Sequence, residues 1–208
     1  DSGSTDATVA LAEAAGARVE RTADWPGFGP QKNRALALAT QPWVLSLDAD
    51  ERVPADLREE ILAVLAAPTA DAWSMPRRSS FCGQYMAHSG WYPDRVTRLF
   101  RRGTARFSDD IVHERLLTDG PAAALRHDLI HESFRDLEMV LDKANSYSTA
   151  GARRLLAQGR EASFGAALAH GLWAFVRTYI LRLGFLDGRL GLALAIANAE
   201  GTYYRYLK

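Results

Sequence analysis

The first half of the sequence alternates apolar segments of helical and strand-like spacing. Helices are predicted where apolar residues recur every three or four positions and a capping or breaking residue marks an end, at residues 5–16, 31–40 and 54–67. Thr5 is expected to cap the first of them. A short strand is predicted at residues 17–22, and an apolar run predicts another at residues 43–47. Helices that alternate with strands at these lengths favour an α/β fold with a mostly parallel sheet and flanking helices.

The pattern changes beyond residue 70. Shorter strands are predicted at residues 71–81, 95–102 and 123–134, separated by loops rich in Gly, Pro and Asp. From residue 136 the spacing becomes helical, with segments near 136–158, 163–183 and 188–206. We therefore expect two domains, an α/β domain over residues 1–135 and a helical extension over residues 136–208.

Composition and charge narrow the function classes. The 208 residues are 48% hydrophobic and 24% charged, which is enough for a sizeable core and argues against disorder. The 25 basic and 25 acidic residues cancel, so no net field favours nucleic acid. Residues 151–208 carry eight Lys or Arg against three Asp or Glu, which suits an anionic surface. The lone cysteine, Cys82, excludes an intramolecular disulfide and is interpreted as a packing residue.

An apolar run, WVLSLDADE at residues 43–51, ends in three carboxylates within four positions. The carboxyl ends of parallel strands form the ligand crevice, and residues two apart in an extended segment point to the same side. Asp48 and Asp50 would then offer two oxygen ligands to a divalent cation such as Mg²⁺ or Mn²⁺. The alternative is that Asp48 caps a turn while Asp50 and Glu51 face water, with Arg52 as a surface partner. The residues alone leave both open.

Several motifs in a fixed order resemble a known enzyme family. The segment DSGSTDAT at residues 1–8, a Gly/Pro loop, GPQKNRALALAT at 29–40 and the strand ending LDADE are similar to the nucleotide-sugar half of glycosyltransferase family 2. Two later segments, GWYPDRVTRLFRR and FSDDIVHERL, resemble the subgroup related to lipopolysaccharide-core glucosyltransferases. The resemblance covers nearly the whole chain and implies a GT-A fold.

The resemblance also assigns residues to the nucleotide-sugar donor: Asp1, Ser2, Gly3, Lys32, Asn33 and Asp48. Asp1 would lie against the base and ribose, Ser2 and Gly3 would shape the turn, and Lys32 would lie near the diphosphate. The alternatives are an ordinary capped turn at the start and a solvated first helical turn for Lys32 and Asn33. Members of the family normally begin with a strand, a helix and a second strand before the first of these residues. We expect those elements to be missing from this sequence and the chain by itself to be inactive.

Direct displacement at an anomeric carbon requires a base for the acceptor hydroxyl. Glu114 is the favoured candidate, because it follows two apolar residues and so would project from a strand end, and Asp110 is the reserve. His113 would contact the metal or a phosphate. The alternative is a surface strand whose His and Glu only contact neighbouring arginines. Further along, His127 and His131 are interpreted as strand residues without a role.

An aromatic loop, HSGWYPD at residues 88–94, is the candidate acceptor site. Trp91 and Tyr92 would stack on a sugar ring, and Asp94 would bind a sugar hydroxyl. Arg98 would serve a phosphorylated acceptor. Packing of the two aromatic residues, and a water-facing Arg98, remain the alternatives.

The tail contains a row of large apolar residues at helical spacing: Phe164, Leu168, Leu172, Phe175, Tyr179 and Leu183. His170, Arg177 and Arg182 interrupt the apolar stretch, so it does not predict a membrane span. It either packs on the catalytic domain or enters the headgroup region of an anionic leaflet. We expect a mixture of both, with the protein peripheral at the cytoplasmic face of the inner membrane.

Two functions follow from these patterns. The first is an inverting, metal-dependent glycosyltransferase that moves a sugar from a nucleotide-diphosphate sugar to a lipid-linked or lipopolysaccharide-core acceptor. The second is a catalytically silent sugar- or lipid-binding scaffold that keeps the GT-A shell. A nucleotidyltransferase would need a Gly-rich triphosphate loop, and the sequence has no apparent one.

Overall fold

The computed structural model describes residues 1–109, 114–160 and 162–208. The chain divides into two compact units. The first unit comprises Asp1–Ser46, Pro68–Ser74 and Thr97–Ala124, and the second comprises Leu47–Ala67, Met75–Val96 and Leu125–Lys208. The predicted division at residue 135 remains a prediction.

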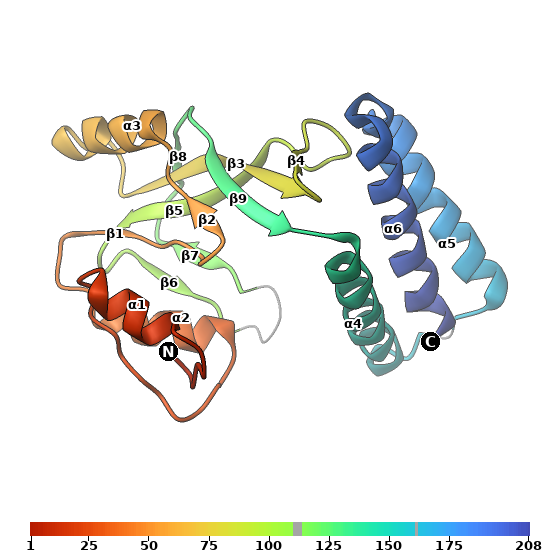
Figure 1. The fold of residues 1–208 in the computed structure, drawn as a ribbon, viewed down its shortest axis with the longest axis horizontal. Coiled ribbons are helices and arrows are strands. Elements are labelled where there is room, and N and C mark those ends of the chain that lie inside the picture. Colours follow the sequence, from red (N-terminus) through yellow and green to blue (C-terminus); the bar gives the residue numbers. More distant parts are fainter. Residues whose placement is uncertain (110–113, 161) are drawn as a thin grey trace. The chain divides into compact units, whose positions relative to one another are not determined.

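A mixed sheet is the central β element, with its strands in the order β1-β5-β3-β9-β2 (Figure 1). These strands are β1 (Trp43–Leu45), β5 (Asp94–Arg101), β3 (Ala72–Phe81), β9 (Leu129–Phe134) and β2 (Glu51–Arg52), and β4 (Gln84–Tyr85) and β8 (Ala123–Ala124) also pair with β3. β3 is parallel to β9 and β8, whereas β1 pairs with β5 and β2 pairs with β9 in antiparallel fashion. The predicted α/β class is confirmed.

The first unit carries α1 (Thr8–Ala14), α2 (Phe28–Ala37) and a two-stranded sheet of β6 (Ala105–Phe107) and β7 (Leu116–Thr118). Its core includes Leu99, Phe100 and Phe107, all nearly inaccessible to solvent. The strand predicted at residues 17–22 is wrong, because no described strand pairs with this segment. The predicted Thr5 cap is also wrong, since the Asp6 carboxylate accepts the hydrogen bond from the N–H at the start of α1.

The second unit carries α3 (Ala55–Ala66), α4 (Leu137–Ala157), α5 (Phe164–Val176) and α6 (Gly188–Leu207), with two short helical turns, η1 (Arg177–Leu181) and η2 (Gly184–Asp187), between α5 and α6. Asp136 caps α4 by accepting from Met139 N at 2.8 Å, and Ser163 caps α5 by accepting from Ala166 N at 3.1 Å. The helices predicted beyond residue 136 are therefore present. Their packing residues Val140 and Leu194 join one buried cluster with Phe81.

Small residues of α5 make its contact with α6. Ala167, Gly171 and Ala174 are buried, and a Cβ added to Gly171 would lie 3.1 Å from the Tyr203 Cβ atom. Four members of the predicted apolar row are exposed, Phe164, Leu168, Leu172 and Leu183, with Leu172 at 67%. Phe175 and Tyr179 are half-buried and pack against each other. Among the described residues, no helix combines the length and apolar character that crossing a membrane requires.

Candidate functional site

A cavity of about 530 Å³ in the first unit brings two predicted donor residues together. Asp1 and Lys32 both line it, with Thr22 and Gln31 beside them. The Asp1 carboxylate accepts hydrogen bonds from Gly3 N at 3.0 Å and Ser4 N at 3.1 Å, so the segment is a capped turn. Gly3 has a φ of 103°, which glycine adopts without strain. A capped turn and a cavity wall are therefore compatible at this position.

Thr22 and Gln31 are polar residues of this cavity that the sequence reasoning missed. The Gln31 Nε2 atom donates to the Thr22 Oγ1 atom at 3.1 Å, and the Ser2 and Thr22 hydroxyl oxygens lie 3.4 Å apart. These contacts join the loop at residue 22 to both the first turn and α2. No motif in the sequence singled out Thr22, because its contacts are with residues far from it in the chain.

Glu114, the candidate base, forms an ion pair with Lys32. The Lys32 Nζ atom lies 2.8 Å from the Glu114 Oε1 atom, and the two side chains are 21% and 18% exposed. Lys32 also lies over the Phe107 ring, 5.5 Å from its centroid. The alternative of contacts with neighbouring arginines did not foresee this partner, 82 positions away in the sequence. The reserve base Asp110 and the predicted metal ligand His113 lie outside the described residues.

Asn33 and Gly29 attach α2 to the segment that precedes Glu114. The Asn33 amide donates to Phe107 O and accepts from Phe107 N, both at 2.9 Å. A Cβ on Gly29 would lie 1.9 Å from Ser108 O, so only glycine permits this approach. Asn33 is thus not a solvated helical residue. Contact between Asn33 and the nucleotide sugar remains a prediction. The observed hydrogen bonds of Asn33 position the helix that carries Lys32.

The acidic cluster of the second unit forms a tight turn. Glu51 N donates to Asp48 O at 3.0 Å, and Asp48 N donates to the Glu51 Oε2 atom at 3.1 Å. The assumption of an extended Asp48–Asp50 segment is therefore wrong, because this hydrogen bond folds the chain back. The alternative in which Glu51 faces water is contradicted. Its side chain is 0% exposed and pairs with Arg77 at 3.3 Å.

His131 lies in β9, as the predicted strand placement requires, and next to Asp50, and its lack of a role remains a prediction. The His131 Nε2 atom is 3.4 Å from the Asp50 Oδ2 atom, and its Nδ1 atom is 2.8 Å from the Ser79 hydroxyl. Pairing of β2 with β9 produces this contact, since it sets Glu51 opposite His131. The side chain of Asp50 is 47% exposed, so its carboxylate remains accessible to a ligand.

The donor chemistry of Asp48 and Asp50 fits Mg²⁺ or Mn²⁺, which prefer carboxylate oxygens. Within residues 1–109, 114–160 and 162–208, no group of three or more His, Cys, Asp or Glu side chains has the arrangement to hold a metal. Mg²⁺ is commonly bound through one or two carboxylates, with water and substrate phosphates completing the shell. The two aspartates therefore fit a cation shared with a diphosphate, and their role as ligands remains a prediction.

His127 also has a partner that the sequence did not reveal. Its backbone N–H and its Nδ1 atom contact the Glu60 Oε2 atom at 3.0 and 2.9 Å, and Arg126 N donates to the same carboxylate. Burial raises the pKa of Glu60, but the backbone N–H groups and His127 outweigh it, so the net pKa is lowered. Glu60 thus joins α3 to the loop before β9.

The predicted acceptor residues have mostly internal partners. Asp94 accepts from Arg77 at 2.6 and 3.0 Å, and the Tyr92 hydroxyl donates to Asp128 at 2.9 Å. Burial, reinforced by Asp128, raises the pKa of Tyr92. Arg98, in the first unit, is only 8% exposed, which contradicts the water-facing alternative. Acceptor binding by these residues remains a prediction.

Trp91 packs as well as facing a cavity. Its ring centroid lies 5.7 Å from that of Phe81 and 5.9 Å from that of Phe134. It is only partly buried, and the same indole lines a cavity of the second unit. The packing alternative is thus met for this residue, and stacking on a sugar ring remains a prediction.

Comparison with known proteins places this chain in a family. The sequence model of "Glycosyl transferase family 2" matches residues 1–134. The chain belongs to glycosyltransferase family 2. It is 35% identical to the "Lipopolysaccharide core biosynthesis glycosyltransferase LpsC" of Rhizobium meliloti, over all of this chain and 78% of that protein. A glycosyltransferase of Rickettsia conorii is 29% identical over all of this chain and 78% of its own length.

A shorter match is to a TPR repeat-containing protein of Synechococcus elongatus, 39% identical over 49% of this chain and 24% of that protein. The resemblance inferred from the order of the motifs is confirmed at the level of family 2. The chain is therefore a glycosyltransferase with a GT-A-like α/β fold.

Proposed function

We propose that this family 2 protein transfers a sugar, with inversion, from a nucleotide-diphosphate sugar to a lipid-linked or lipopolysaccharide-core acceptor, with Mg²⁺ or Mn²⁺ as cofactor. The observation that carries the proposal is the acidic turn of Asp48 and Asp50, buttressed by Glu51 and His131. The 35% identity to the lipopolysaccharide core biosynthesis glycosyltransferase supports the acceptor class.

The chemistry assigned to the chain's own residues is a single displacement. The acceptor oxygen forms a bond to the anomeric carbon, the bond from that carbon to the diphosphate oxygen breaks, and the hydroxyl proton passes to the Glu114 carboxylate. Lys32 holds that carboxylate at 2.8 Å. Asp1 and Lys32 line the cavity assigned to the donor. A cation at Asp48 and Asp50 would supply charge stabilisation for the leaving diphosphate.

The test is nucleotide release by the full-length protein with a panel of nucleotide sugars, in Mg²⁺, Mn²⁺ or excess EDTA. Asp48→Asn and Asp50→Asn should each lower the rate by about 10²-fold or more if the carboxylates hold the cation. Glu59→Gln, which removes an exposed carboxylate from α3, is the control and should leave the rate unchanged. Full activity in EDTA, or in both Asn variants, would refute the metal-dependent mechanism. Ligand binding without turnover would favour the scaffold.

We also propose that the helical tail attaches the protein to the cytoplasmic face of the inner membrane. Leu168 and Leu172 belong to an outward apolar row on α5, and residues 151–208 are basic. An exposed apolar helical face beside basic residues suits an anionic lipid surface. Leu168→Ser with Leu172→Ser should lower binding to phosphatidylglycerol vesicles in flotation, whereas Leu11→Ser, an equally exposed position on α1, should not. Equal loss in both variants would argue against the assignment.

A further inference from the structure

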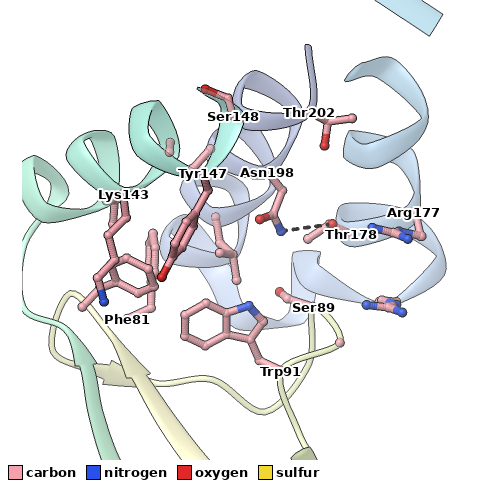
Figure 2. A pocket seen from close by; sticks show the side chains of 18 of the residues that line it. Phe81, Ser89, Trp91, Lys143, Tyr147, Ser148, Arg177, Thr178, Asn198 and Thr202 are labelled. Atoms are coloured by element: carbon pink, nitrogen blue, oxygen red, sulfur yellow. Dashed lines mark hydrogen bonds between the residues drawn. The ribbon is translucent and has the colours of Figure 1, made fainter. Parts of the chain in front are cut away.

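A second cavity, of about 410 Å³, lies wholly within the second unit. Figure 2 shows Trp91 at one side, Lys143 and Tyr147 of α4 on a flank, and Asn198 of α6 with Thr178 of η1 opposite. Its volume is in the range of pockets that hold small ligands, about 300–1,000 Å³. None of the donor or metal residues assigned above lines it.

The loop that carries Trp91 into this cavity is held by one buried carboxylate. Asp187 is only 5% exposed and accepts hydrogen bonds from Ala87 N at 3.1 Å, His88 N at 3.1 Å and the Ser89 hydroxyl at 2.9 Å. These bonds fix the backbone immediately before Gly90 and Trp91. The indole therefore occupies a set position, which lowers the entropic cost of placing a ring against it.

The cavity is strongly basic. Its lining includes four cationic side chains, Lys143, Arg177, Arg182 and Arg205, and no Asp or Glu among the described residues. Across the part of the chain that the structure describes, none of the four forms an ion pair. Lys143 is half-buried and the three arginines are exposed, so the lining gives the hollow a positive potential that favours an anionic ligand.

Two of these cations lie beside Trp91 or the residues next to it. Arg182 lies against Gly90, where an added Cβ would be 2.3 Å from the Arg182 Nη1 atom, and Arg182 O accepts from Ser89 N at 2.8 Å. The Lys143 Nζ atom lies 4.8 Å from the centroid of Phe134, which itself contacts Trp91. An aromatic surface thus lies next to an ammonium and a guanidinium.

Neutral polar groups complete the lining. The Asn198 Nδ2 atom donates to the Thr178 Oγ1 atom at 3.4 Å, a long hydrogen bond (Figure 2). Amide and hydroxyl groups of this kind exchange readily with sugar hydroxyls. An aromatic ring, neutral donors and acceptors, and several cations in one cavity together match a sugar ring that carries an anionic group.

We propose that this cavity binds a phosphorylated sugar, with the ring against Trp91 and the phosphate against Arg182 and Arg177. The inference rests on the proposed function, because the phosphorylated sugar is assigned to the acceptor. A guanidinium forms paired hydrogen bonds with phosphate oxygens, which makes arginine the suitable cation here. The aromatic wall distinguishes this ligand from a free anion or a phospholipid headgroup, since neither offers a sugar ring to stack.

Direct binding measurements test the site without donor or divalent cation, so they do not depend on transfer. The probes are glucose 6-phosphate, glucose, inorganic phosphate and glycerol 1-phosphate. Binding of each probe to the full-length protein is measured by calorimetry. Glucose 6-phosphate should bind about tenfold or more tightly than each of the other three, the equivalent of one charge-assisted or stacking contact. Arg182→Ser should weaken this binding about tenfold. Arg189→Ser, an exposed arginine of α6 outside the cavity, should leave it unchanged.

A filled cavity gives a second test. Ala144 lines the cavity from α4, and Ala144→Leu should abolish sugar phosphate binding while the thermal transition is retained. Three results would overturn the proposal: no binding of glucose 6-phosphate, equal binding of inorganic phosphate or glycerol 1-phosphate, or an equal effect of Arg182→Ser and Arg189→Ser. A protein that fails in sugar transfer but binds the sugar phosphate refutes the proposed reaction and leaves this site in place. A protein that transfers sugar but fails to bind refutes only this site.

Discussion

The ion pair between Lys32 and Glu114 should couple the stability of the chain to the proposed base. The perturbation is Lys32→Met, Glu114→Gln and the double variant. A hydrogen bond between charged groups contributes about 1.5–3 kcal/mol. At 2.8 Å, with about a fifth of each side chain exposed, solvent screening reduces it. We expect a coupling free energy of about 1–2 kcal/mol.

The assay is a double-mutant cycle by thermal and urea unfolding. For a chain of this size, about 1–2 kcal/mol corresponds to a shift in melting temperature of roughly 2–8 °C. The pair of Arg34 and Asp24 has the same 2.8 Å separation but is far more exposed, so its coupling should be smaller and more sensitive to salt. A Lys32–Glu114 coupling below about 0.3 kcal/mol would refute the reasoning, because that is within the error of additivity.

The same variants separate stability from catalysis. Glu114→Gln should lower sugar transfer by about 10²–10⁴-fold if Glu114 is the base, with donor binding retained. Lys32→Met should weaken donor binding as well, because Lys32 lines the cavity shared with Asp1. If Glu114→Gln lowers the transfer rate only as far as it lowers the fraction of folded protein, Glu114 has a structural role alone.

Three further outcomes follow from the packing and the hydrogen bonds. Gly29→Ala should destabilise by about 1–3 kcal/mol in thermal unfolding, because the added Cβ meets Ser108 O at 1.9 Å, whereas Gly120→Ala, in open space, should not. Asp187→Asn should cost about 2–4 kcal/mol in urea unfolding, since an amide accepts fewer of the hydrogen bonds, and an unchanged midpoint would contradict that role. Because the folded pKa of Glu60 is lowered, its stabilisation is present above the ordinary value near 4.5 and is lost as pH falls through the folded pKa. The stability gap between wild type and Glu60→Gln should therefore close in acid, and a gap that stays constant with pH would contradict the assignment.

Local sequence signals identified most of the elements but not their partners. The helices beyond residue 136 were predictable because caps such as Asp136 and Ser163 precede long apolar repeats. The short strands β2, β6 and β7 were not, since two or three residues carry no measurable period. Pairing across the sheet decides such strands, and a single sequence does not contain it.

In the candidate site, too, the sequence indicated which residues to examine but not which residues they contact. The motifs assigned Asp1 and Lys32 to one ligand, and both line one cavity. They also singled out the acidic cluster, but not the turn into which it folds. The contacts of Glu114 with Lys32, and of Glu51 with Arg77, were not predictable, because each joins residues far apart in the chain. Sequence spacing describes neighbours along one element, whereas these ion pairs depend on how different elements fold together.

Different residues of α5 form its contact with α6 and its exposed surface. Gly171 and its small neighbours lie at the contact between the two helices, while Leu168 and Leu172 face outward. These two positions can therefore change without disturbing that contact. Substitution of Leu168 or Leu172, in evolution or by engineering, can change the surface that α5 offers to a binding partner. Gly171 does not allow such substitution, because a side chain there would meet α6.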